Sequence, residues 1–440
     1  MTPQGRLRTV RTRNAACGGP DRGPGRHTIA ACDAPRHPSP GIAPAGGGRL
    51  VPQSDVAIVG GGAAGLSLAW RLLDPPAGVP APSVVLVDAP AGPLRPPERT
   101  WCYWEEGPGD YDDLLTASWD RLRVRAADGH ATVRRLDRLR YKMLRSPAFE
   151  EGLRPRLAAL TRLGAVVERI EDQPEGAVLD CRASDGSPTS VRARWVFDSR
   201  PPSTAPARSA LLQHFRGWFV RTRRPAFRPE VVEFMDFRTP QPRHGLSFGY
   251  VLPTGPCEAL VEYTEFGPGV LTEQAYAAAL RHYTRDVLRL GAYEVLGEER
   301  GVIPMTDARH VPRAGRHVFR IGAAGGAVRP STGYAFSAIQ RQTRAVAAAV
   351  HRGHVPVPPP AYRARHLAMD AILLRGLATG RVPGAPFFSR LFRSVPAERM
   401  LRFLDGETRP AEDVLIGLRT PVLPMLRSAA GLPFLPRVPH

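Results

Sequence analysis

The sequence predicts an α/β fold in which a Rossmann-like domain is joined to an antiparallel-sheet domain and followed by C-terminal helices. Three observations predict it. A buried strand runs through a glycine turn into a helix in residues 54–73, apolar and polar residues alternate with period two across residues 212–266, and a second glycine turn precedes a helical pattern in residues 319–350. Strand, turn and helix units build parallel sheets, whereas period-two segments build antiparallel sheets with one covered face, so we expect two domains.

The predicted boundaries follow these changes in pattern. The first residues are rich in Arg, Gly and Pro, so we expect a disordered basic tail at 1–52 and a fold that begins at Asp55. We assign 53–200 and 301–350 to the Rossmann-like domain, 201–300 to the antiparallel-sheet domain and 351–440 to a C-terminal helical region. A chain of 440 residues exceeds a typical single hydrophobic core, which agrees with this division.

The individual elements follow from hydrophobic periodicity in chain order. We expect strands at 56–59, 84–90, 166–170, 177–181 and 195–200, and helices from the first glycine turn to about Leu73, at 141–163, at 272–289 and through most of 361–428. The antiparallel sheet is expected from four segments with frequent aromatic residues: QHFRGWFVRT, EVVEFMDFR, LSFGYVLP and EALVEYTEF.

The first glycine turn has the pattern of a dinucleotide-binding unit. Gly60 permits a tight turn, Gly62 lets the backbone approach a pyrophosphate, and Gly65 allows the helix to pack closely on the strand. Asp88 ends the next strand, where it can accept a hydrogen bond from a ribose 2′-hydroxyl. The second turn contains Gly322, Gly325 and Gly326. Because helix N-termini bind anions, the two turns together predict a cofactor held between them.

Composition leaves the charge of the chain with two interpretations. The formal net charge is +19, which suggests a polyanionic partner such as nucleic acid or an anionic membrane. Lys142 is the only lysine, however, so a general bias toward Arg explains the charge equally well, and we expect no nucleic-acid partner. The five cysteines form no C-x-x-C pair, so we expect neither a metal site nor a disulfide framework. No signal peptide is expected, and the sequence has no signal for oligomeric state.

The segment ALVEYTEF, residues 259–266, places carboxylates in an apolar strand. Side chains alternate along a strand, so Glu262 and Thr264 face one side and Tyr263 and Glu265 the other. If the first side lines an apolar cavity, desolvation disfavours the charged carboxylate and Glu262 stays protonated near neutral pH. Such a carboxyl can donate a proton as a general acid. The alternative is an ordinary surface or ion-paired glutamate.

The motifs together resemble those of the flavoprotein lycopene cyclases, a bacterial and plant-type family that closes the end rings of lycopene. The matching stretches, in the family's order, are VGGGAAG (59–65), ERTWCYW (98–104), VFDSR (196–200), QHFRGWFV (213–220), MDFR (235–238), YVLP (250–253), ALVEYTEF (259–266), GVIPMTD (301–307), AAGGAVRPSTGYAFSAIQ (323–340) and FFSRLF (387–392). The resemblance implies an FAD-binding fold of the flavin monooxygenase or geranylgeranyl reductase type, reduced FAD with NADPH as its reductant, and redox-neutral cyclisation of lycopene or a monocyclic carotene to β-rings.

The resemblance also implies roles for particular residues. Glu262 takes the position of the essential acid, and the second glycine turn packs against the flavin. We expect the substrate pocket to include Trp101, Tyr103, Trp104, Tyr263, Thr264 and Tyr334, although composition alone favours a core position for the first three. The chain departs from the family at Glu98, where Asp is usual, at Pro201, where Gly is usual, and at Tyr263, where a second acid is usual.

A lipid-borne substrate implies contact with a membrane. No segment is expected to span the bilayer, because glycines interrupt the apolar run at 54–73. We therefore expect a cytoplasmic protein attached peripherally to the inner face of the cell membrane, through Arg-rich apolar stretches such as 387–404, with core-packing helices as the alternative for that stretch. Two rival functions are an NADPH-consuming flavoprotein reductase or monooxygenase of an isoprenoid or polyene and, through the basic tail, a nucleic-acid-binding protein.

Overall fold

The computed structural model describes residues 49–201 and 205–438. The tail predicted for residues 1–52 therefore lies almost wholly outside the described residues. Its predicted boundary is wrong, because β1 (Arg49–Val59) starts six residues before Asp55. The backbone of Arg49 already pairs with Thr189 of β10 (Pro188–Asp198), and the ladder continues past an irregularity between Val51 and Ser54.

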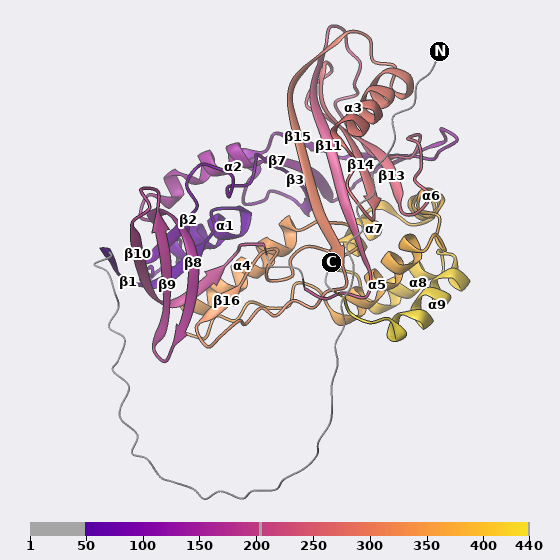
Figure 1. Ribbon diagram of the computed structural model, residues 1–440. Helices are drawn as coiled ribbons and strands as arrows, with labels where there is room; N and C mark the ends of the chain where they lie inside the picture. The colour runs from indigo at the N-terminus through magenta and orange to yellow at the C-terminus, as the bar shows by residue number, and fades with distance from the viewer. Residues whose placement is uncertain (1–48, 202–204, 439–440) are drawn as a thin grey trace, which may run out of the picture. The chain divides into compact units, whose positions relative to one another are not determined.

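The first sheet has six strands in the order β1, β2, β8, β9, β10 and β16, with an additional pairing of β1 to β10 (Figure 1). The remaining bounds are β2 (Val84–Asp88), β8 (Thr161–Gln173), β9 (Gly176–Ala183) and β16 (Val318–Arg320). Strand alternation divides the residues of β1 between two cores: Val56 and Ile58 pack with α1 (Ala63–Leu73) and α4 (Phe336–His351), whereas Ala57 and Val59 pack with β8, β9 and β10.

The second sheet has seven strands in the order β15, β11, β14, β13, β12, β5 and β6. Their bounds are β5 (Arg121–Arg125), β6 (Ala131–Arg135), β11 (Ala210–Thr222), β12 (Val231–Asp236), β13 (Leu246–Pro253), β14 (Glu258–Gly267) and β15 (Tyr293–Thr306). All neighbours are antiparallel except β12 and β5. The predicted domain boundaries differ from this arrangement, because β5 and β6 belong to the second sheet and residue 301 falls inside β15.

A three-stranded sheet lies in the segment that connects the first strands to β8. It consists of β3 (Thr100–Glu106), β7 (Leu139–Arg145) and β4 (Ala117–Trp119), in the order β3, β7, β4. The helix predicted for 141–163 is therefore largely wrong. Only α2 (Ser146–Leu153) is α-helical there, because β7 occupies the first residues and Pro155, which has no backbone N–H, stands where the helix would continue.

The helix predicted for 272–289 divides into two parts. Its α-helical part is α3 (Glu273–His282), which begins where the Thr272 hydroxyl accepts a hydrogen bond from the Ala275 N–H, and a π-helical turn follows at Tyr283–Val287. The C-terminal region is helical as predicted. Its helices are α5 (Ala364–Ala378), α6 (Gly384–Ser394), α7 (Ala397–Leu404), α8 (Pro410–Gly417) and α9 (Val422–Gly431).

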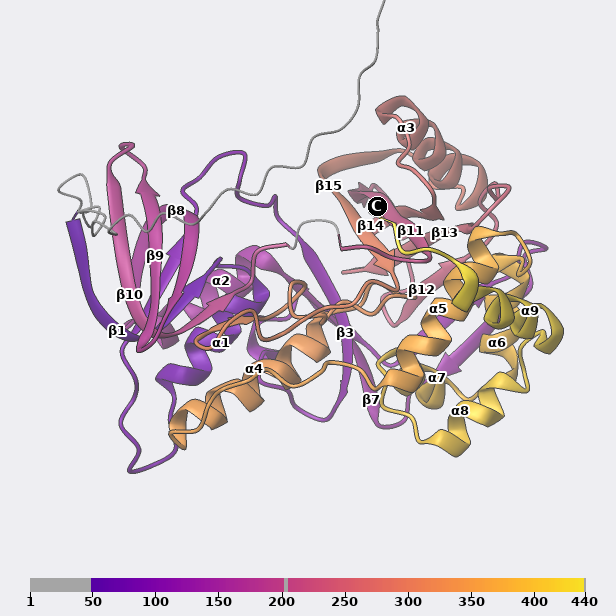
Figure 2. The same ribbon diagram turned by 60° about the horizontal axis from the view of Figure 1, so that its bottom comes forward.

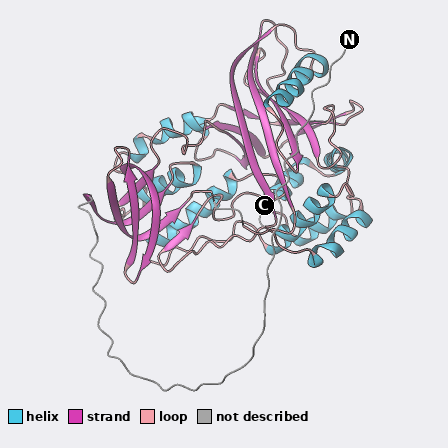
Figure 3. Cartoon of the chain, viewed as in Figure 1, coloured by secondary structure: helices cyan, strands magenta, loops and turns pink. Residues whose placement is uncertain are grey.

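The C-terminal helices cover one end of the second sheet (Figure 2). Phe387, Phe388 and Phe392 of α6 and Met400 of α7 are buried in one core with residues of β12 and β13. In Figure 3 the strands form two groups, with α4 running between them and the α5 to α9 group beside the second. None of the helices in the described ranges is both long enough and apolar enough to cross a membrane.

Candidate active site

The first glycine turn has the geometry of a phosphate-binding loop. Gly60 adopts φ +95°, and a Cβ on Gly65 would lie 1.9 Å from the Gly60 carbonyl oxygen, so both positions require glycine. A Cβ on Gly62 would meet no atom within 4 Å, so the space in front of this residue is open to a ligand. The Gly61 N–H donates to Asp88 Oδ1 at 2.9 Å, which places the predicted ribose acceptor directly beside the turn.

The start of α1 offers unpaired backbone N–H groups to an anion. Gly62 is the N-cap, no side chain caps the helix, and its first turn contains no acidic residue. The second glycine turn packs against this end, because a Cβ on Gly322 would lie 2.8 Å from Ala64 Cβ. Gly322 has φ +62°, and its N–H donates to Gln342 Oε1 at 2.9 Å. The two turns thus meet, as a cofactor held between them requires.

The other two glycines of the second turn are required by close packing rather than by open space. A Cβ on Gly325 would lie 2.5 Å from the Arg320 carbonyl oxygen, and one on Gly326, which has φ +78°, would lie 3.1 Å from His310 Cβ. A dinucleotide pyrophosphate fits the open, uncapped helix start beside Gly62. The described residues therefore fit the predicted group at the first turn, with the second turn as an adjacent wall.

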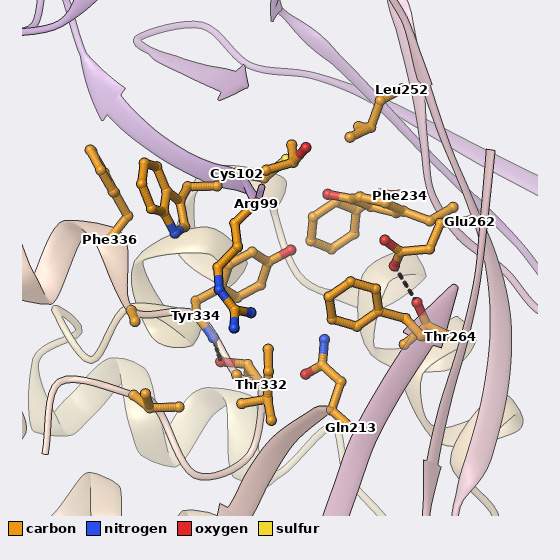
Figure 4. A pocket seen from close by; sticks show the side chains of 18 of the residues that line it. Arg99, Cys102, Gln213, Phe234, Leu252, Glu262, Thr264, Thr332, Tyr334 and Phe336 are labelled. Atoms are coloured by element: carbon orange, nitrogen blue, oxygen red, sulfur yellow. Dashed lines mark hydrogen bonds between the residues drawn. The ribbon is translucent and has the colours of Figure 1, made fainter. Parts of the chain in front are cut away.

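A cavity of about 340 Å³ extends from this second turn to the second sheet (Figure 4). Its wall includes Ala323 and Ile339 at one end and the strands β11 to β15 at the other. Most of the lining is apolar and aromatic, with Phe234, Phe248 and Leu252 from the sheet and Phe388 and Phe392 from α6. Such a space suits a hydrocarbon.

Glu262 is buried in this apolar wall. Glu262 is 8% exposed, and the Thr264 hydroxyl donates a hydrogen bond to Glu262 Oε1 at 2.5 Å. Desolvation is the main cause that raises the pKa of Glu262 to about 8, the carboxyl of Glu299 raises it further, and the Thr264 hydrogen bond acts in the opposite direction. The carboxyl is therefore mostly protonated at neutral pH.

Burial holds three titratable side chains near Glu262 in their neutral forms. Burial raises the pKa of the Cys102 thiol and the pKa values of the Tyr250 and Tyr334 hydroxyls. These groups come from β3, from β13 and from the loop before α4. Glu262 is thus an acid beside neutral groups, and the carboxyls of Glu98 and of Glu299 on β15 also line the cavity.

Three of the six predicted pocket residues line the cavity: Trp101, Thr264 and Tyr334. The Trp101 ring stacks on Phe336, with centroids 5.6 Å apart and planes 27° apart. Phe336 begins α4, so this aromatic pair closes the end of the cavity nearest the second glycine turn.

Tyr103, Trp104 and Tyr263 do not line the cavity, which corrects their prediction as pocket residues. The cavity reaches only the first three residues of β3, so Tyr103 packs on Phe336 in the core and Trp104 meets Tyr334 edge to face from outside. Tyr263 lies on the opposite face of β14, because neighbouring side chains of a strand point to opposite sides.

The loop before α4 is held by a buried ion pair that sequence reasoning missed. Arg329 donates to both oxygens of Asp370, from Nε at 2.6 Å and from Nη2 at 3.0 Å, and the Ser331 hydroxyl donates to the same carboxylate at 2.7 Å. Arg329 is 1% exposed. Because Asp370 comes from α5, this pair connects the C-terminal helices to the wall that carries Tyr334.

Glu299 and Tyr250 were also missed as site residues. The position of Glu299 depends on the pairing of β15 with β11, and no local pattern reveals that register. Tyr250 lies in YVLP, a motif of the resemblance, and that motif was the only signal that could have identified it.

Comparisons with known proteins agree with this architecture. A family model described as "Lycopene cyclase protein" matches residues 55–430. Comparison with curated proteins gave no match.

The fold is shared with several solved flavoprotein-type structures. A flavoprotein/dehydrogenase from Cytophaga hutchinsonii is 13% identical with a TM-score of 0.57, over 87% of this chain and 99% of that one. A geranylgeranyl bacteriochlorophyll reductase-like protein from Thermoplasma acidophilum is 12% identical with a TM-score of 0.53, over 86% and 96%. The p-nitrophenol 4-monooxygenase PnpA from Pseudomonas putida is 15% identical with a TM-score of 0.52, over 86% and 98%. These likenesses show the fold predicted from the sequence.

Proposed function

We propose that this chain, which belongs to the lycopene cyclase family, is a lycopene β-cyclase that closes the acyclic ends of lycopene into β-rings without net redox change. One observation carries the proposal: Glu262 is a buried carboxyl with its pKa raised to about 8, and it lines a cavity of aromatic and aliphatic side chains. A protonated carboxyl in an apolar cavity suits proton transfer to a hydrocarbon, which has no heteroatom for the protein to bind.

Glu262 delivers its proton to the terminal double bond of the acyclic end, and the neighbouring double bond attacks the resulting carbocation to close a six-membered ring. A ring proton then leaves and restores the acid, so the product is an isomer of the substrate and no electrons are consumed. Thr264 fixes the carboxyl through its hydrogen bond. The rings of Phe234 and Trp101 exclude water and present π-faces, which favour cations.

The proposal includes FAD in its reduced form, with NADPH as the reductant. The residues that would hold its pyrophosphate and ribose are the backbone of Gly60 and Gly62, the N-terminus of α1 and Asp88, with Gly322 on the adjoining wall. When bound, a reduced flavin supplies negative charge near the developing cation, which explains a redox cofactor in an isomerisation.

The Glu262→Gln variant tests the proposed acid. The change is nearly isosteric but removes the transferable proton, so we expect cyclisation to fall by at least about a hundredfold while the FAD content stays unchanged. The assay is anaerobic, with pre-reduced FAD and lycopene, and the carotenes are separated by chromatography. Glu258→Gln is the matched control, because Glu258 lies on the same strand, pairs with Arg221 and is outside the cavity. Full activity of the Glu262 variant would remove this residue from the mechanism.

The same assay separates the proposal from an NADPH-consuming reductase or monooxygenase. With FAD reduced beforehand, a cyclase forms many equivalents of bicyclic product without further NADPH. A reductase or monooxygenase instead consumes one NADPH for each product molecule. Stoichiometric NADPH oxidation, measured by absorbance, would reject the cyclase proposal.

Contact with a lipid surface is also part of the proposal, through a different segment from the one predicted. The apolar residues of 387–404 are buried in the core, so that stretch is not the attachment site. Exposed apolar residues occur instead on α8, at its C-cap and on α9, and we name this set the α8–α9 face: Val414, Leu415, Leu418, Val422, Leu423 and Leu426.

The charge of this segment matches an anionic bilayer. No acidic residue occurs in residues 414–440, whereas Arg419 and Arg427 are exposed beside the α8–α9 face. Side chains of the face are 47–65% exposed, and Phe434 beyond it is 87% exposed. An apolar face flanked by Arg is the pattern of peripheral attachment to anionic lipid, where the substrate is dissolved.

A further inference from the structure

Glu262 of β14 and Glu299 of β15 lie on either side of Gly217, which is on the strand between them, β11. In the ladder of β14 and β11, Glu262 is opposite Gly217, and in the ladder of β11 and β15, Gly217 is opposite Glu299. Residues in register on adjacent strands point to the same face, so all three positions face the cavity side. A Cβ on Gly217 would lie 3.5 Å from Glu262 Cβ and 3.5 Å from Glu299 Cγ. Because Gly217 has no side chain, nothing from β11 separates the two carboxyls.

The environments of the two carboxyls differ in a way that decides which one carries the proton. Glu299 is half-buried on the edge strand, accepts a 2.5 Å hydrogen bond from the Thr100 hydroxyl, and has Arg99 and Arg145 nearby, all of which favour its charged form. Burial still raises the pKa of Glu299, but these partners oppose the shift. Among the residues that the structure describes, only the Thr264 hydroxyl favours the charged form of Glu262. The negative charge of the pair therefore rests on Glu299.

The other groups that face Glu262 do not compete for this role. Three of them are the Cys102 thiol of β3, the Tyr250 hydroxyl of β13 and the Tyr334 hydroxyl of the loop before α4, and burial raises the pKa of each. All three are therefore neutral when Glu299 is already ionised. Glu98, Arg99 and Arg300 also line the cavity, but Glu98 pairs with Arg145 and Arg99 acts on Glu299. Glu299 is the charged group that acts directly on Glu262 within the part of the chain that the structure describes.

We propose that Glu299 is a positioning residue for the reaction: its carboxylate, on the far side of Gly217, keeps the proton on Glu262 and so sets the upper pH limit of catalysis. The inference rests on the proposed function. During turnover the proton moves from Glu262 to the terminal double bond, and the ring proton returns to Glu262, while Glu299 stays ionised throughout. No net proton or electron is consumed.

This arrangement also explains how the site can contain two carboxyls without two adjacent acids in the sequence. A side chain that follows Glu262 on β14 points to the other face of the sheet, as Tyr263 does. A second carboxyl in the same cavity cannot come from the position next to Glu262, and here β15 supplies one across Gly217.

The test compares Glu299→Gln with Glu299→Asp and Glu298→Gln. Glu298 is the matched control, because it is adjacent on β15 but pairs with Arg216 and does not line the cavity. Rates of cyclisation by the holoenzyme with pre-reduced FAD are measured against pH. In Glu299→Gln we expect the alkaline limit to move down by about one pH unit, the size expected of a lost like charge nearby, with kcat lowered and KM unchanged. In Glu299→Asp, which keeps a carboxylate, the alkaline limit should lie close to that of the wild type. In Glu298→Gln the alkaline limit should match that of the wild type.

A second readout needs no substrate and separates this inference from the proposed function. Because the folded state holds the proton on Glu262 more tightly than the unfolded state, the free energy of unfolding of the wild type should decline as the pH rises. Urea unfolding measures this decline, and we expect it to be smaller in Glu299→Gln. If the wild type forms no cyclic carotene, the proposed function fails, whereas this decline still reports the coupling. An alkaline limit and a decline that both match the wild type in Glu299→Gln would overturn the inference. If Glu299→Gln lacks FAD or unfolds early, Thr100→Val replaces it, because loss of the Thr100 hydrogen bond disfavours the charged form of Glu299. The alkaline limit should again move down, and a limit that matches the wild type contradicts the inference.

Discussion

The buried acid should make the wild-type protein less stable than its Glu262→Gln variant at alkaline pH. The pKa of Glu262 rises from 4.5 to about 8 on folding, so the folded state holds a proton that the unfolded state releases. For such a group, the stabilisation is complete below pH 4.5 and is lost as the pH rises toward about 8. Glutamine does not titrate, so the variant should keep its stability through this window.

The size of the effect follows from the shift. Each pKa unit corresponds to about 1.4 kcal/mol, so the full window is worth at most about 5 kcal/mol, less where solvent reaches the charged carboxylate. Urea unfolding of wild type, Glu262→Gln and the control Glu258→Gln, at several pH values between 4.5 and 9 or so, measures it. The difference between wild type and Glu262→Gln should grow steadily with pH. A difference that stays constant across the window would show that the carboxyl is not held neutral, and would refute the reasoning.

The remaining predictions concern the glycine turn and the membrane face. Gly65→Ala should reduce both stability and FAD content, because its Cβ would lie 1.9 Å from a backbone oxygen. Gly62→Ala should lose FAD but keep its stability, because its Cβ would meet no atom within 4 Å. Flavin absorbance measures the FAD content and urea midpoints measure the stability, and equal FAD contents in wild type and Gly62→Ala would contradict the prediction. Replacing Leu423 and Leu426 by Glu should abolish flotation with anionic liposomes at low salt. Val311→Glu, at a similarly exposed site away from α8 and α9, is the control and should float like the wild type. Unchanged flotation of the double variant would count against attachment through the α8–α9 face.

Local patterns predicted those parts of the fold that local interactions determine. The glycine turn at Gly60, its helix and the following strand were predicted within a few residues, because each element is specified by residues next to one another. The prediction of a helix at 141–163 was wrong because the periodicity did not show that residues 139–145 would pair with β3. The domain boundary predicted at residue 300 differs from the structure for a related reason. The chain enters the second sheet twice, and β15 spans the boundary.

The candidate site divides in the same way. Strand alternation alone placed Glu262 and Thr264 on one face, and the structure puts both in the cavity wall. Alternation also places Tyr263 on the other face, so its prediction as a pocket residue conflicted with the strand pattern itself. Glu299 could not be predicted, because its approach to Glu262 depends on the register of three strands that are distant in sequence.

The opposite face of β14 shows why an acid on this strand need not act as Glu262 does. Tyr263 donates to Glu265 at 2.9 Å, and His214 is hydrogen-bonded to Tyr276 through Nδ1 at 2.7 Å while its Nε2 lies 3.9 Å from Glu265. Burial raises the pKa of Glu265 and lowers the pKa of His214, so both side chains tend toward their neutral forms.

The difference between the two acids lies in their partners. Glu265 faces the hydroxyl of Tyr263 and the imidazole of His214, so its nearest proton partners are polar side chains. Glu262 faces Phe234 and Leu252 across a cavity, with one hydrogen bond from Thr264, so its proton is directed toward whatever fills that apolar space. Because burial on both faces favours the protonated carboxyl, burial alone does not select the catalytic acid. The selection comes from the cavity on one face, and this is why the apolar run of β14 can carry two buried glutamates with different roles.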